Sequence, residues 1–163
     1  MRIAVVQKTL GGVLAIIMFA LAPLSAAQEK PADNMQILRD KIKADKKLVV
    51  AANMELTEPE ARGFWPLYEQ YQKSLQQINQ RIVNMLESYA ADFRNKSLSD
   101  DKAKQLITEA VAIEQAEANL KSTYAPQLSK VLPVRKVARY LQIENKIRAI
   151  VKYDIATGVP LVQ

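Results

Sequence analysis

The sequence contains no cysteine and no histidine, and these two absences remove most of the chemistry open to a small protein. Without cysteine there is no disulfide framework and no thiol for lipid attachment. Nucleophilic catalysis would need a serine–lysine pair or two carboxylates, and the chain has neither a Gly-x-Ser-x-Gly turn nor a phosphate-binding glycine loop. A transition-metal site would have to use carboxylates alone. We therefore expect no enzyme activity, no cofactor and no metal site.

Glycine is also scarce, with four residues in a chain of 163. Beyond the first 27 residues only Gly63 and Gly158 remain. A β-sandwich or barrel needs a turn about every 8–12 residues and would use more glycine than this. The scarcity favours an all-α fold.

The N-terminal segment has the three parts of a secretory signal peptide. Basic residues precede an apolar run over 10–24, and small residues at 25–27 form a cleavage site. The run is shorter than the roughly 20 apolar residues of a membrane-spanning helix, which argues against an uncleaved anchor. We predict a signal peptide over 1–27 and a single helical domain over 28–163.

The remaining chain is mildly basic. Without Arg2 and Lys8 of the predicted signal peptide, the formal net charge falls from +6 to +4. An exported protein rarely meets nucleic acid, so we do not expect nucleic-acid binding. The surplus charge instead suggests acidic protein partners, weak contact with an anionic membrane surface, or solubility.

This positive charge is concentrated in the first predicted helix, over 34–53. Apolar side chains recur along one side of that helix, and basic residues outnumber acidic ones on the other. The simplest interpretation is a solvated face above a core stripe, and a surface for acidic clients or lipid headgroups is the alternative. The candidate binding residues on this face are Arg39, Lys43, Lys46 and Lys47.

The stretch "LTEPEARGFWPLYEQYQ" opens a second predicted helix, over 58–94. Thr57 is a good N-cap, and Glu60 three residues later completes a capping box. Apolar residues then recur at alternating spacings of four and three, a coiled-coil-like seam that implies a partner helix along its length. Trp65 and Leu67 lie off this seam. We expect them to pack under the first or last helix or to contact a client, with Trp65 as the first candidate.

A second seam of the same spacing predicts a third helix over 100–130. The short connection makes it antiparallel to its predecessor. Glu117 interrupts the seam, and the register of the two helices places it near Gln77 and Arg81. We expect an ion pair that sets the register, with a functional carboxylate as the alternative.

The last helix is predicted over 134–157. Gly158 suits the position after its end, and the apolar segment "VPLVQ" follows. We expect this segment to dock on the bundle, with presentation to a partner as the alternative. The residues expected to face inward are Val137, Tyr140, either Ile143 or Glu144, Ile147 and Val151.

The helix starts "LTEPE" at 56–60 and "LPVRK" at 132–136 form a weak internal repeat. An exported, cysteine-free, all-helical chain of this length with two such motifs resembles the Spy and CpxP family of periplasmic proteins, which carry a Leu-Thr-x-x-Gln motif twice. The first copy here has Glu60 where the family has glutamine. The second has Pro133 and Lys136 in place of threonine and glutamine.

The resemblance implies a four-helix protomer built on a long antiparallel helical hairpin and dimerised into a curved cradle in the periplasm. It implies an ATP-independent chaperone or envelope-stress adaptor that binds unfolded or partner envelope proteins. A dedicated regulator that binds a sensor kinase or another envelope partner, without general chaperone activity, is the alternative.

Several apolar residues lie off the two seams and cannot all be covered by one partner helix. The short helices, a second protomer or a client could cover them: Trp65, Leu67, Val83, Leu86 and Phe93.

Overall fold

The computed structural model describes residues 45–162, and within this range the chain is helical, with no strand. The predicted all-α class is therefore confirmed. The predicted signal peptide and the first part of the helix expected over 34–53 lie outside the described residues. No helix in the described part is long and apolar enough to cross a membrane.

The described helices begin and end close to their predicted bounds. A helical segment covers 45–54, α2 spans Glu58–Asn95, α3 spans Asp100–Leu128 and α4 spans Val134–Gly158. The predicted bounds of the last three differ from these by two residues at most. The predicted capping box of α2 is present, because the Thr57 N–H donates to Glu60 Oε2 at 2.8 Å. At the start of α3 the Lys102 N–H donates to Ser99 Oγ at 3.3 Å. The prediction for Gly158 is wrong, because Gly158 is the last residue of α4 and Val159 is its C-cap.

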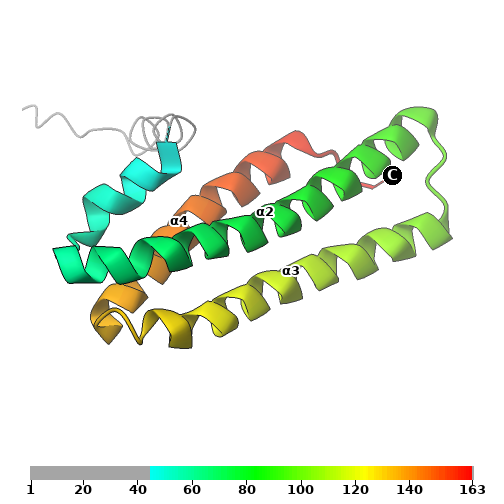
Figure 1. Ribbon diagram of the computed structural model, residues 1–163. Helices are drawn as coiled ribbons and strands as arrows, with labels where there is room; N and C mark the ends of the chain where they lie inside the picture. Colours follow the sequence, from blue (N-terminus) through cyan, green and yellow to red (C-terminus); the bar gives the residue numbers. More distant parts are fainter. Residues whose placement is uncertain (1–44, 163) are drawn as a thin grey trace, which may run out of the picture.

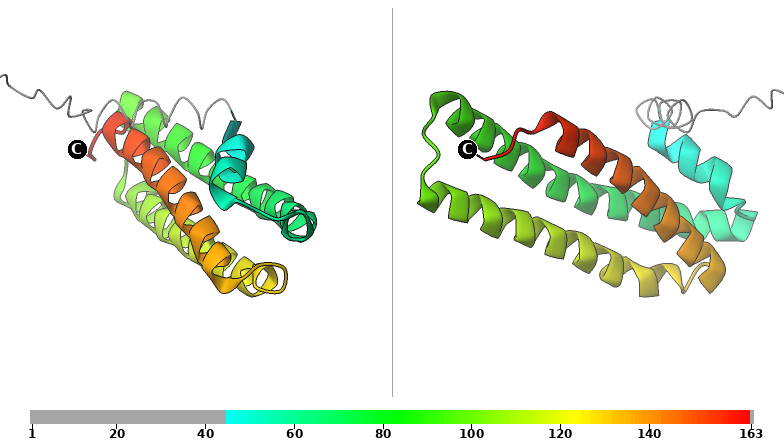
Figure 2. Two further views of the ribbon diagram at one scale, coloured as in Figure 1. Left: turned by 90° about the vertical axis from the view of Figure 1, so that its left-hand side faces the viewer. Right: turned by 180° about the vertical axis from the view of Figure 1, so that it is seen from behind.

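The helices form an elongated molecule (Figure 1). Helices α2 and α3 run side by side in opposite directions, and α4 returns along this pair and crosses it obliquely. The segment over 45–54 lies beside the beginning of α2, far from the α2–α3 connection (Figure 2). Because α4 stops short of that connection, the α2–α3 tip has less helical cover than the opposite end.

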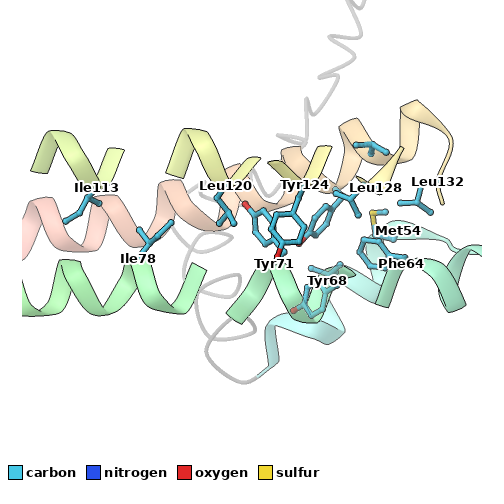
Figure 3. Packing of buried hydrophobic residues seen from close by; sticks show 13 residues of the cluster. Met54, Phe64, Tyr68, Tyr71, Ile78, Ile113, Leu120, Tyr124, Leu128 and Leu132 are labelled. Carbon is cyan, nitrogen blue, oxygen red and sulfur yellow. The ribbon is translucent and has the colours of Figure 1, made fainter. Parts of the chain in front are cut away.

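The core follows the two predicted seams. Figure 3 shows Ile78 of α2 opposite Ile113 of α3, with Tyr71 facing Tyr124 farther along the pair. The rings of Tyr71 and Tyr124 meet edge to face, with centroids 5.4 Å apart. The other buried members of the core cluster come from all the helical segments: Val50, Met54, Phe64, Tyr68, Leu120, Leu128, Leu132, Val137 and Tyr140.

The inward face of α4 differs from the prediction near its end. Glu144 is buried and Ile143 only partly so, which decides between the two predicted alternatives. The prediction for Val151 is wrong, because Ile150 is buried and Val151 is exposed. Since α4 crosses the other helices obliquely, the side that faces the core changes along its length (Figure 1).

The predicted partners of Glu117 are also wrong. Its buried carboxylate pairs with Arg148 of α4, and Lys152 Nζ lies 3.2 Å from its Oε2. Arg81 instead forms a two-pronged ion pair with Glu109, at 2.8 and 3.0 Å. Position 117 of the α3 seam thus faces α4 and not only α2. The ion pair sets the register of α4 against α3.

Gly63 marks a close approach between α2 and the turn that precedes α4. A Cβ at position 63 would lie 2.8 Å from the Cβ of Val131 and 3.0 Å from its Cγ1. The Cβ of Val131 is bonded directly to the backbone, so it cannot move aside unless the turn itself shifts. The absence of a side chain at Gly63 therefore allows this turn to pack against α2.

We predict that Gly63→Ala lowers the free energy of unfolding by about 1–2 kcal/mol, because steric overlap outweighs the gain in helix propensity of about 1 kcal/mol. In a Val131→Gly background the same substitution should stabilise the protein, since the opposing Cβ is gone. Urea denaturation of the four proteins measures both effects. A stabilising Gly63→Ala in the parent chain would contradict the steric argument.

A second prediction concerns acid stability. Burial alone would raise the pKa of Glu117, but hydrogen bonds and positive charge from Arg148 and Lys152 hold it below its ordinary value of 4.5. A carboxyl with a lowered pKa in the folded state stabilises the fold above the unfolded-state pKa, and this contribution disappears as pH falls through the folded-state pKa. Stability should therefore fall below about pH 4.5. Glu117→Gln should lower stability at neutral pH and flatten this acid dependence.

The matched control is Glu114→Gln. Glu114 Oε1 lies 2.9 Å from Lys152 Nζ, but its carboxylate is well exposed. Urea denaturation between neutral pH and about pH 3 compares the slopes of stability against pH. An acid slope in Glu117→Gln equal to that of the parent and of the control would show that Glu117 does not contribute.

Candidate functional site

The predicted contact residue Trp65 lies at the junction of α2 and the segment over 45–54. Its ring meets Phe64 and Tyr68 edge to face, with centroids 5.0 and 5.3 Å away. Lys47 Nζ lies 5.2 Å from the centroid of the Trp65 ring, a cation–π contact. Trp65 is only partly buried, as is Leu67, which packs against the same core. Both side chains therefore pack against the core and remain partly exposed to solvent.

Lys46 is part of a largely buried polar network. Its Nζ donates to Glu144 Oε2 and to Gln72 Oε1, both at 2.8 Å. Gln72 Nε2 donates in turn to Glu144 Oε1 at 2.9 Å and to the Tyr140 hydroxyl at 3.3 Å. The Glu144 side chain is only 3% exposed, so its charge needs the Lys46 ammonium beside it. This network ties the segment over 45–54 to α2 and α4.

The remaining basic candidates have different positions. Lys47 Nζ lies 2.6 Å from Glu69 Oε1, and both side chains are about half exposed, so water screens this pair. Arg39 and Lys43 lie outside the described residues. The structure thus brings Lys47 to Trp65, directs Lys46 inward, and leaves their joint role in binding as a prediction.

Three tyrosines beneath this junction have raised pKa values. Burial and the nearby Glu144 carboxylate raise the pKa of Tyr68, Tyr71 and Tyr140 well above the ordinary tyrosine value, which keeps their hydroxyls protonated. Within residues 45–162, no three acidic side chains gather closely enough to hold a metal ion. The exposed surface at this junction combines part of the Trp65 ring with the Lys47 ammonium.

A second candidate surface lies near the α2–α3 connection. It is an open apolar groove of about 300 Å³, partly lined by the segment over 159–162. Ile107, on its α3 side, is 67% exposed. We call this feature the tip groove, and its helical lining consists of Met85, Leu86, Tyr89, Leu106, Ile107 and Ala110.

Most of the tip groove was not among the predicted contacts. Leu86 was predicted to be uncovered, but Ile107, which lines the groove, and Val111, one turn farther along α3, were not. Ile107 directly follows Leu106, Val111 directly follows Ala110, and the two are four residues apart, which is the signal that could have identified a second apolar strip on α3. Whether α4 covers a given part of the α2 and α3 seams depends on where α4 ends in space. The periodicity of apolar residues along one helix does not predict that position.

Comparisons with protein-family models, with curated proteins and with solved structures found no match for this chain. The resemblance to the Spy and CpxP family therefore stays a prediction from the sequence motifs.

We predict that Glu144→Gln destabilises the protein by about 1–3 kcal/mol, because it leaves the Lys46 ammonium without its counter-ion in a largely buried position. The matched control Glu69→Gln removes the exposed partner of Lys47 and should change stability by about 0.5 kcal/mol or less. Trp65 is the only tryptophan, so its fluorescence during urea denaturation follows this junction directly. Equal effects of the two substitutions would contradict a structural role for the Lys46 network.

Proposed function

We propose that this protein is an exported periplasmic binding protein, an ATP-independent chaperone or envelope-stress adaptor without chemistry of its own. The main observation in support is the tip groove, an open apolar groove with a volume of about 300 Å³. Its proposed occupants are apolar segments of unfolded or partly folded envelope proteins.

The clustering of apolar side chains supports this proposal more than their number does. Single exposed apolar residues are ordinary on protein surfaces. Here Ile107 and Val111 are 67% and 64% exposed and lie one turn apart on α3. Leu161, which is 88% exposed, lines the same groove as Ile107. Contiguous apolar surface of this kind favours binding of another apolar chain.

The Trp65 junction supplies a second proposed contact. Lys47 combines an exposed ammonium with the partly exposed Trp65 ring, which suits attraction of acidic segments followed by apolar contact. Arg39 and Lys43 belong to the same proposed basic face. Lys46 is a poor choice for a binding test, because charge reversal there would place two carboxylates together in the interior.

The proposed assembly is a homodimer, as the family resemblance implies. A second protomer could cover part of the apolar surface that the helices leave exposed. Weak contact of the basic first helix with an anionic membrane surface belongs to the same proposal.

We predict that the purified protein suppresses aggregation of two unrelated denatured proteins at near-stoichiometric amounts without ATP, measured by light scattering. The double variant Ile107→Asp/Val111→Asp should need roughly tenfold more protein for the same effect, because two apolar contacts are lost. Trp65→Ala should weaken suppression less. The control is Val134→Asp, an equally exposed apolar position at the start of α4, away from the tip groove.

The outcomes separate the chaperone from the dedicated regulator. Suppression of both unrelated proteins, weakened by Ile107→Asp/Val111→Asp and not by the control, supports a general client surface. Suppression of neither protein would contradict the chaperone proposal. It would leave a regulator with one envelope partner, since such a protein should ignore unrelated unfolded chains.

A further inference from the structure

We infer that the segment over 159–162 is a displaceable strap that lies along the tip groove and limits access to it. The segment lines the groove together with α2 and α3. Figures 1 and 2 show the chain running from the end of α4 toward α2, on the side nearer the α2–α3 connection. The contacts and exposure of residues 159–162 support the displaceable position, and a regulatory role for the strap rests on the proposed function.

The strap leaves α4 as an extended chain and has an anchor on α2. Val159 has φ −99° and ψ 119°, and its N–H donates to the Ile155 carbonyl at 3.0 Å, where α4 ends. The hydroxyl of Tyr89 then donates to the Pro160 carbonyl, also at 3.0 Å. Because the Tyr89 ring is buried, this anchor has a fixed position on the groove wall.

Beyond this anchor the strap is loosely packed. Leu161 and Val162 are 88% and 61% exposed although both line an apolar groove. The segment over 45–54 provides the contrast, because its Val50 and Met54 are fully buried and Lys46 joins it to Glu144. Of the two, the strap buries far less apolar surface per residue, so moving it disrupts less.

The composition of the strap explains how it could give way to another chain. Residues 159–162 carry no charge, and Pro160 has no N–H to donate. Its contact with the groove is therefore limited to apolar surface and the accepted hydrogen bond from Tyr89. An apolar peptide can offer the same two features. The strap would thus cover the part of the groove wall next to Tyr89 when no client is present, and be displaced when one binds.

The test is binding of the hydrophobic dye anilinonaphthalene sulfonate to the purified protein, followed by fluorescence titration. Deletion of residues 159–163 should tighten dye binding roughly tenfold, because apolar groove surface becomes accessible. Tyr89→Phe keeps the ring and removes only the anchor hydrogen bond, and it should cause a smaller increase. This second variant keeps the chain at full length, and circular dichroism checks that both variants fold.

The matched control places the deletion in the Ile107→Asp/Val111→Asp background, where no increase is expected. An increase in the deletion and in Tyr89→Phe that disappears in this background supports the strap. No increase in either variant overturns it, and so does an increase that persists in the aspartate background, because the new surface would lie elsewhere. Since the titration contains no client, its result is independent of the aggregation assay that tests the proposed function.

Discussion

The buried ring of Tyr140 is the contact on which the arrangement of the helices depends. It is fully buried and meets Phe64 and Tyr71 of α2 edge to face, with centroids 5.1 and 5.7 Å away. Burial of such a ring contributes about 1.5–3 kcal/mol, and each aromatic pair adds about 0.5–1.5 kcal/mol. Its hydroxyl accepts a hydrogen bond from Gln72, which extends the contact into the polar network around Glu144.

Two buried carboxylates follow from this placement of α4. Glu144 lies one turn beyond Tyr140 and takes Lys46 as its counter-ion, while Glu117 of α3 takes Arg148. Buried ion pairs add little net stability compared with apolar packing, but a buried carboxylate without its partner is strongly unfavourable. The two pairs therefore act as register pins. They allow α4 and the segment over 45–54 few alternative positions.

The same constraint explains why the candidate binding surfaces occur at the two ends of the molecule. Aromatic contacts and the polar network hold α4 and the segment over 45–54 against the beginning of α2. Trp65 is therefore only partly exposed there. The opposite end is left with α2, α3 and the short segment over 159–162. The apolar groove thus results from unequal cover along a long helical pair.

The sequence by itself determined the helices, the N-cap of α2 and the seams of α2 and α3, because capping and helical periodicity depend on residues only a few positions apart. It also identified Trp65 and Lys47 as separate contact candidates, but it did not show that their side chains meet or that Lys46 points inward. The partners of Glu117, the choice of Ile150 over Val151 and the tip groove around Ile107 were decided by tertiary structure alone. Each depends on where α4 crosses and ends, and that position comes from contacts between residues far apart in the chain.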